Sequence, residues 1–201
     1  MIILLESNLE TYSEKAYEAD LQLLPPQRYE KAITYRFPAD RKRCVKAYML
    51  LWEGLRREYG LTEPPVFTFG EHKKPFLAGH DNIQFSLSHT GNAVLCVLDR
   101  EPVGADIEMI RMQKMEHLLT VFNDAEQEKI RLAEQPEICF TTLWTRKESF
   151  LKLTGDGLVG TRTLQQIPTD DTDSVHFESV IREAEGFVYS WCQWKPGALC
   201  E

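Results

Sequence analysis

Two carboxylates lie two residues apart in the segment Gly-Ala-Asp-Ile-Glu, residues 104–108. Side chains two apart on a β-strand point to the same face, so Asp106 and Glu108 would lie side by side. Ala105 and Ile107 would then face a core. Adjacent carboxylates repel one another unless a cation lies between them, and this pair suits Mg²⁺, which binds few carboxylates together with water and ligand phosphates. The alternative is a half-exposed edge strand whose acidic side chains face solvent, as most acidic side chains do.

A second group of charged residues lies in Trp-Thr-Arg-Lys-Glu-Ser-Phe-Leu-Lys, residues 144–152. Glu148 and Lys152 are four residues apart and would share one face of a helix. Lys147 interrupts the apolar stripe of this helix, and a lysine in a buried stripe needs a partner for its charge. Taken alone, Glu148 and Lys152 are more typical of a surface ion pair worth about 0.3–0.5 kcal/mol.

A third group ends the β-prone segment Phe-Ser-Leu-Ser-His-Thr-Gly, residues 85–91. Functional side chains often lie where a strand gives way to a loop. His89 could donate a hydrogen bond to a phosphate oxygen, and Ser88 could offer its hydroxyl. A lone histidine at a strand end is, however, more often structural.

Basic residues upstream add positive charge. Arg28 and Lys31 are three apart on an expected helix, Arg-Lys-Arg at 41–43 opens a longer helix, and Lys73-Lys74-Pro75 precedes the Ser-His strand. Each is typical of solvated surface charge when taken alone, but together they provide enough cations to bind a polyphosphate. Helical geometry places Arg41 rather than Arg43 on the apolar face, so the choice between these two arginines stays open.

The composition is that of a globular protein, with 43% hydrophobic and 27% charged residues among 201. A net charge of −8 argues against nucleic acid as the main partner, because binding phosphate backbones requires a basic surface. The five cysteines form no CxxC pair, which fits a reducing compartment. The apolar run near the N-terminus is too short for a signal peptide or a membrane helix, so we expect a cytoplasmic protein without membrane contact.

The expected elements alternate between helical and β-prone segments, which predicts an α+β fold. Pro25-Pro26 should separate two helices within residues 9–35, and an apolar stripe predicts a helix over 39–59. Further helices are expected at 113–122, 124–134 and 137–153. The expected strands are Ile2–Leu5, Val66–Phe69, Ile83–Leu87, Ala93–Leu98, Val103–Ile107, Val175–Ile181 and Phe187–Trp194.

In this order, the motifs resemble the 4'-phosphopantetheinyl transferase superfamily, in the larger type that activates peptide and polyketide synthetases. The matching blocks are Asp40–Arg43 with its helix, Lys74-Pro75, Phe85–His89, Gly104–Glu108 and Trp144–Lys152. The resemblance implies a pseudo-dimer of two similar α/β halves, residues 1–101 and 102–201, with coenzyme A in the cleft between them and the metal site on the second half. Because one chain holds both halves, we expect a monomer.

The resemblance also implies the site residues. Mg²⁺, or Mn²⁺ in its place, would be held by Asp106, Glu108 and Glu148. The 3'-phosphate of coenzyme A would lie near Arg28, Lys31, Arg43 and His89. Lys74, Ser88 and Lys152 would line the rest of the coenzyme site, and Lys147 would orient Glu148 or contact phosphate. The match is looser at the N-terminus, where Arg28 and Lys31 correspond by spacing alone, and it is poor over residues 158–201.

The implied activity is that of a holo-[acyl-carrier-protein] synthase. A serine hydroxyl of an acyl or peptidyl carrier protein would attack the β-phosphorus of coenzyme A and release 3',5'-ADP. Glu148 is the candidate base, and Lys152 would stabilise the leaving charge. Two other interpretations stay open: another Mg²⁺-dependent transferase of a nucleotide diphosphate, and a degenerate member that binds coenzyme A or a carrier protein without transfer.

Carrier proteins of this kind tend to be acidic, so a net charge of −8 gives no general attraction. The docking patch should then be apolar or locally basic. We expect it around residues 111–122, near Met109, Met112, Met115, Leu118 and Leu119. The alternative is that these methionines fill gaps in a core.

Overall fold

The computed structural model describes residues 1–111, 119–156 and 163–198. The helices are α1 (Glu14–Gln22), α2 (Pro26–Thr34), α3 (Pro38–Tyr59), α5 (Asp124–Leu132) and α6 (Pro136–Thr154). The strands are β1 (Ile2–Glu6), β2 (Phe67–Phe69), β3 (Pro75–Leu77), β4 (Gln84–Thr90), β5 (Ala93–Asp99), β6 (Val103–Met109), β7 (Val175–Arg182) and β8 (Phe187–Trp194). The α+β class expected from the sequence is confirmed.

Prolines and glycines set the helix ends. Pro26, Pro38 and Pro136 each occupy the first turn of a helix, where the missing N–H would have no intrahelical partner. Gly60 and Gly155 end α3 and α6 in the left-handed conformation, with φ of 69° and 78°. The break expected at Pro25-Pro26 therefore occurs, between α1 and α2.

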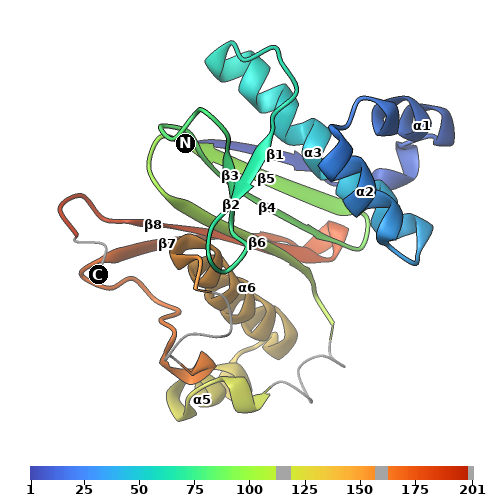
Figure 1. Cartoon of the computed structure of the whole chain (residues 1–201). Helices are drawn as coiled ribbons and strands as arrows, with labels where there is room; N and C mark the ends of the chain where they lie inside the picture. The colour runs from blue at the N-terminus through green and yellow to red at the C-terminus, as the bar shows by residue number, and fades with distance from the viewer. Residues whose placement is uncertain (112–118, 157–162, 199–201) are drawn as a thin grey trace.

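Two three-stranded antiparallel sheets have the same internal order. The first is β1-β5-β4 and the second is β6-β8-β7, so each consists of a leading strand paired with the second strand of a later hairpin. In Figure 1, α3 lies above the first sheet and α6 lies below the second. This repetition is what a pseudo-dimer requires, although the equivalence of the two halves stays a prediction.

The two sheets face each other across one apolar core. Ala93, Leu95 and Val97 of β5 meet Val103, Ala105 and Ile107 of β6, with Phe187 and Trp191 of β8. The expected inward direction of Ala105 and Ile107 is confirmed. The opposite face of the first sheet packs on α3, through Leu4, Val94, Cys96 and Leu98. The opposite face of the second sheet packs on α6, through Phe150, Leu153 and Cys192.

Among the described residues, no backbone hydrogen bonds between strands join the two sheets. Hydroxyl side chains join them instead. Alternate residues of β4, Ser86, Ser88 and Thr90, point at β6. Ser86 Oγ accepts from the N–H of Ala105 at 2.9 Å. We call Ser86, Ser88 and Thr90 the hydroxyl row. It fixes β6, and hence its acidic residues, against the end of β4.

Some expected elements differ from the structure. Strand β3, which pairs with β2, was not expected, because it has only three residues and begins at a proline. The helix expected at 113–122 and most of the methionine patch lie outside the described residues; of that stretch, Leu119–Val121 form a short 3₁₀ turn.

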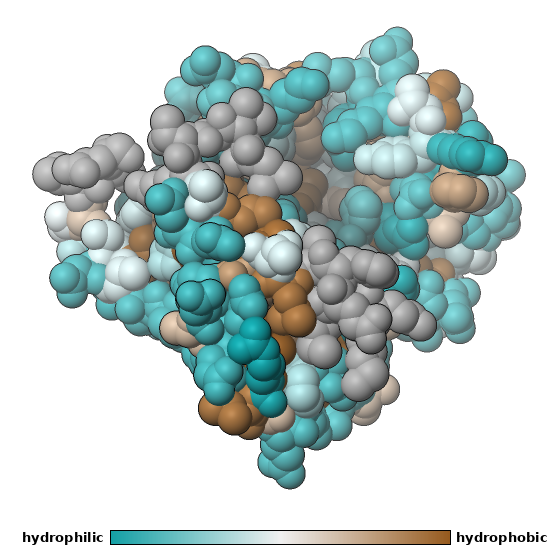
Figure 2. All heavy atoms as spheres, turned by 90° about the horizontal axis from the view of Figure 1, so that it is seen from below, coloured by the Kyte–Doolittle hydropathy of each residue, from teal (hydrophilic) through white to brown (hydrophobic). Residues whose placement is uncertain are grey.

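Figure 2 shows the face seen from below, where hydrophilic side chains surround a narrow apolar band. Among the described helices, none has the length and apolar character needed to cross a membrane.

Candidate active site

The site depends on the close approach of α6 to β6. Gly104 lies directly beneath α6, and a Cβ at this position would lie 1.9 Å from the carbonyl oxygen of Ser149 and 2.4 Å from the amide nitrogen of Leu153. Only glycine permits this contact. The absence of a side chain thus brings the helix carrying Glu148 and Lys152 down onto the strand carrying Asp106.

Asp106 is the buried centre of the site, at 5% exposure. Its Oδ1 accepts hydrogen bonds from Lys152 Nζ at 2.7 Å and from Ser88 Oγ at 2.7 Å. The structure therefore brings together one residue from each of the three motifs. The ammonium of Lys152 provides the positive charge that a buried carboxylate requires.

Glu108 lies on the same face of β6 as Asp106, closer to the strand end and half-buried. Its Oε2 accepts from the hydroxyl of Thr90 at 3.2 Å. The side-by-side arrangement expected from strand alternation is therefore present. Each carboxylate receives a hydrogen bond from a different member of the hydroxyl row.

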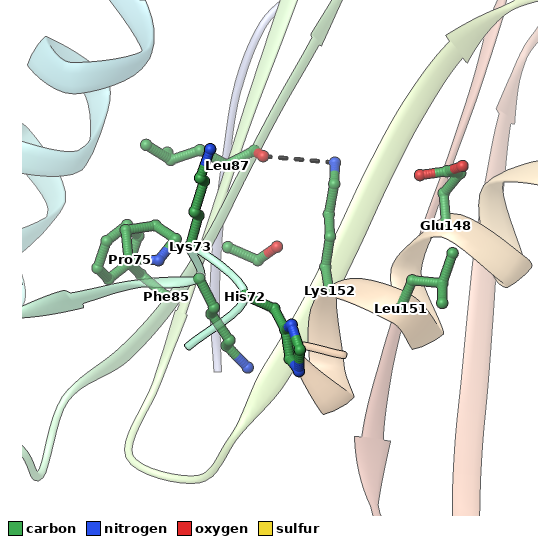
Figure 3. A pocket seen from close by; sticks show the side chains of 11 residues that line it. His72, Lys73, Pro75, Phe85, Leu87, Glu148, Leu151 and Lys152 are labelled. Atoms are coloured by element: carbon green, nitrogen blue, oxygen red, sulfur yellow. Dashed lines mark hydrogen bonds between the residues drawn. The ribbon is translucent and has the colours of Figure 1, made fainter. Parts of the chain in front are cut away.

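A cavity of about 280 Å³ opens between β4 and α6, and Lys152, which pairs with Asp106, is part of its lining. Figure 3 shows Glu148 and Lys152 rising from the same side of α6, one turn apart, with Lys152 reaching across to the carbonyl oxygen of Leu87 at 3.4 Å. The opposite wall contains Phe85 and Leu87 of β4 and the turn before β3. The cavity thus has an apolar wall on β4 and a charged wall on α6.

Two lysines of the β2–β3 turn border this cavity. Lys74 Nζ donates to the carbonyl oxygen of Leu153 at 2.7 Å and so caps the last turn of α6 from the other half of the chain. Burial lowers the pKa of Lys74. Lys73 has a φ of 66°, and it is the one residue other than glycine with positive φ among those described. This conformation is disfavoured for a lysine by about 1 kcal/mol, so the turn holds strain at the edge of the cavity.

Arg43 lies at the end of β4, near His89. One Nη donates to the carbonyl oxygen of Gly91 at 2.6 Å, and the other pairs with Asp40. Arg41 instead donates to the carbonyl oxygen of Tyr35 at 2.8 Å. Burial lowers the pKa of His89, and the charges of Arg43 and Lys152 lower it further. A patch of two cations, Arg43 and Lys152, therefore flanks His89 where the strand ends.

Arg28 is separated from this patch by its burial. Its side chain is 6% exposed, and its guanidinium lies 5.1 Å from the ring centre of Phe67 and 5.9 Å from that of Tyr48. Its Nε has no hydrogen-bond partner among the described residues. Lys31 is exposed nearby, and partial desolvation of its ammonium together with the charge of Arg28 lowers its pKa. Arg28 and Lys31 thus form a second cationic pair on α2.

Lys147 has its charge partner outside the residues that line the cavity. Its side chain is fully buried on the far side of α6, where Nζ pairs with Glu126 at 2.9 Å and donates to the carbonyl oxygens of Leu164 and Ile167 at 2.9 and 3.0 Å. An ammonium has three hydrogens, and these three acceptors use all of them. The Lys147 ammonium is therefore fully paired in this arrangement, and its expected contact with phosphate stays a prediction. The charge partner that its position in an apolar stripe required is Glu126.

Within the part of the chain that the structure describes, one oxygen of Asp106 is free to accept a cation. Asp106 Oδ2 is buried and has no hydrogen-bond partner among the described residues, and such an orphaned carboxylate oxygen is suited to a metal. Within residues 1–111, 119–156 and 163–198, however, no three His, Cys, Asp or Glu side chains are gathered closely enough to enclose an ion. The residues present therefore fit a cation at Asp106, whereas the three-carboxylate set of Asp106, Glu108 and Glu148 stays a prediction.

Thr90 is the site residue that sequence reasoning missed. Its signal was the alternation of hydroxyl residues at 86, 88 and 90 on one strand, which places them on one face. That alternation indicates a polar face but not its partner, and the partner strand β6 becomes visible only in the fold.

The chain is similar to known proteins that share one family description. The family model of the 4'-phosphopantetheinyl transferase superfamily matches residues 102–197, the part that carries β6 and α6. The chain is 28% identical over 149 residues to 4'-phosphopantetheinyl transferase Sfp of Bacillus subtilis, covering 73% of this chain and 66% of that protein. It is 33% identical over 143 residues to 4'-phosphopantetheinyl transferase psf-1 of Bacillus pumilus, covering 68% and 61%. It is 36% identical over 101 residues to 4'-phosphopantetheinyl transferase AcpT of Salmonella typhi, covering 47% and 52%.

These matches confirm the resemblance that the motifs predicted: the chain is similar to members of the 4'-phosphopantetheinyl transferase superfamily. The matched part spans less than two thirds of the length of these relatives.

Proposed function

We propose that this protein transfers the 4'-phosphopantetheine group of coenzyme A to a serine of an apo acyl or peptidyl carrier protein. The observation that carries the proposal is the contact of Lys152 Nζ with Asp106 Oδ1 at 2.7 Å, beside a cavity bounded by both halves of the chain. The names of the relatives, each a 4'-phosphopantetheinyl transferase, support the same reaction class.

The cationic groups suit a diphosphate substrate. Lys152 and Lys74 border the cavity, and Arg43 and His89 lie at the end of β4. Phosphate oxygens are held well by ammonium and guanidinium groups, which form charge-assisted hydrogen bonds. In the proposed complex, Lys152 donates to the diphosphate as well as to Asp106. Arg43 and His89 face the 3'-phosphate. The guanidinium of Arg28 is buried. We therefore propose that Arg28 influences phosphate binding only through the effect of its charge on Lys31.

Asp106, Glu108 and Glu148 are the residues proposed to hold Mg²⁺ or Mn²⁺. When bound there, the metal would neutralise charge on the diphosphate. The hydroxyl oxygen of the carrier serine forms a bond to the β-phosphorus, and Glu148 takes the proton of that hydroxyl. The bond between that phosphorus and the bridging oxygen breaks at the same centre, and 3',5'-ADP leaves with the electron pair. Lys152 stabilises the charge that develops on the leaving oxygen.

The test is the intact mass of an apo carrier protein after incubation with this protein, Mg²⁺ and one of several donors. We expect a gain of one phosphopantetheine with coenzyme A, its loss in EDTA, and no transfer from other nucleotide diphosphates. Carrier proteins of fatty-acid, polyketide and peptide synthesis should be compared in this assay. We propose that the protein acts as a monomer. Binding of coenzyme A without transfer to any carrier would favour a degenerate binder, and absence of binding would contradict the proposal.

A further inference from the structure

Thr90 is the last residue of β4 and makes two contacts with β6. Its Oγ1 lies 3.2 Å from Glu108 Oε2 and 3.4 Å from the backbone nitrogen of Met109. A backbone N–H can only donate, so the hydroxyl oxygen accepts there. A hydroxyl carries a single hydrogen, and that hydrogen is then directed at the carboxylate of Glu108.

The position of Thr90 is fixed by its surroundings. It pairs with Ala93 across the β4–β5 hairpin, and the next residue, Gly91, has a φ of 47°. A Cβ on Gly91 would lie 2.8 Å from the sulfur of Met109, so the hairpin fits closely against the end of β6. Arg43 holds the carbonyl oxygen of Gly91 from α3. The Thr90 hydroxyl is therefore part of a constrained turn.

Glu108, in contrast, has a long side chain at a half-buried strand end. Ordering a glutamate side chain costs up to about 1.5–2 kcal/mol of rotamer freedom. A hydroxyl that holds the carboxylate in place before a ligand arrives removes part of this cost. Groups of this kind behind metal ligands commonly change metal affinity by about 10–100-fold when removed.

We infer that Thr90 is a positioning residue that holds the Glu108 carboxylate in the orientation in which it binds the metal. The inference rests on the proposed function, which assigns Glu108 to the metal. Ser88 has the same relation to Asp106, which also pairs with Lys152.

The test compares Thr90→Val, which removes the hydroxyl at nearly constant volume, with Thr90→Ser, which keeps it. Thr169→Val is the matched control. Thr169 Oγ1 donates to Glu126 Oε1 at 2.8 Å in a buried position remote from the acidic pair, so the same bond type is lost away from the site. The measurement is the binding of Mn²⁺ in the presence of coenzyme A, followed by the electron paramagnetic resonance of free Mn²⁺, together with the melting temperature.

We expect Thr90→Val to weaken Mn²⁺ binding by about tenfold or more, with Thr90→Ser close to the wild type. Thr169→Val should lower the melting temperature and leave Mn²⁺ affinity unchanged. If Thr90→Val binds Mn²⁺ as tightly as the wild type, the inference about Thr90 is wrong, but the proposed function is not affected. The same holds if Thr169→Val loses as much Mn²⁺ affinity as Thr90→Val. A wild-type chain that binds no Mn²⁺ would overturn the proposed metal site and this inference together.

Discussion

His89 lies in a partly buried position between two cations, Arg43 and Lys152. Burial first, and these charges second, lower its pKa below the ordinary value of about 6.5. Protonation of the imidazole is thus disfavoured until a negative charge arrives. A phosphate at this patch would raise the pKa again, because it stabilises the imidazolium.

The lowered pKa of His89 gives stability a pH dependence with a definite sign. When the pH falls through about 6.5, the unfolded chain takes up a proton on this histidine that the folded chain does not. The free energy of unfolding should therefore fall between pH 7 and pH 5. Urea unfolding at three pH values should show a smaller fall in His89→Gln than in the wild type. Identical falls in both proteins would contradict the environment described for His89.

Lys147 and Glu126 form a buried ion pair that joins α6 to α5 and to the segment after residue 163. Lys147→Met leaves the Glu126 carboxylate buried without its cation, so we expect a loss of about 3–5 kcal/mol in the free energy of unfolding. Thermal or urea unfolding measures this loss. Where the variant folds, its affinity for coenzyme A should equal that of the wild type; a large loss of affinity in folded Lys147→Met would show that the lysine does contact the coenzyme.

The residue level also shows what a sequence can predict. The shared face of Asp106 and Glu108 follows from alternation along a single strand, and the charge partner required by Lys147 follows from its place in an apolar stripe. The identity of that partner does not follow, because Glu126 lies on another helix. The same limit applies to Thr90, and to Arg28, whose burial depends on Tyr48 and Phe67 from other elements.

The packing of α6 on β6 makes Gly104 a strict requirement. Gly104→Ala would place a methyl group against the backbone of Ser149 and Leu153, which cannot rotate away. We expect a loss of about 1–3 kcal/mol or more in stability, together with loss of transfer activity, because Glu148 and Lys152 move with the helix. Gly60→Ala is the control: it is strained by its positive φ but meets no atom within 4 Å, so it should lower stability while keeping activity. A fully active Gly104→Ala would contradict this packing.

Most elements could be predicted because their signals are local. The helix expected at 39–59 is α3 (Pro38–Tyr59), and the strands expected at 93–98 and 103–107 are β5 and β6. Their ends follow from prolines, glycines and apolar periodicity. The hydroxyl row could not be predicted as a junction, since the side-chain contact of β4 with β6 depends on how the two sheets pack and not on either strand alone.

The two sheets share one core, and this core crosses the boundary of the expected division into residues 1–101 and 102–201. Leu95 and Val97 from one side of that boundary pack against Ala105 and Ile107 from the other. We expect a single cooperative unfolding transition, with tryptophan fluorescence and far-ultraviolet circular dichroism giving the same midpoint. Two separate transitions would instead show that the halves are stable independently.

Glu148 shares the cavity with Lys152, and it is the residue proposed to take the proton of the carrier serine. The most direct measurement is the single-turnover rate of phosphopantetheine transfer to an apo carrier protein, followed by intact mass, for the wild type and Glu148→Gln, with coenzyme A affinity measured in parallel. We predict a rate lower by about 10²-fold or more in Glu148→Gln, with affinity changed little. A Glu148→Gln protein that transfers at nearly the wild-type rate would contradict the assignment.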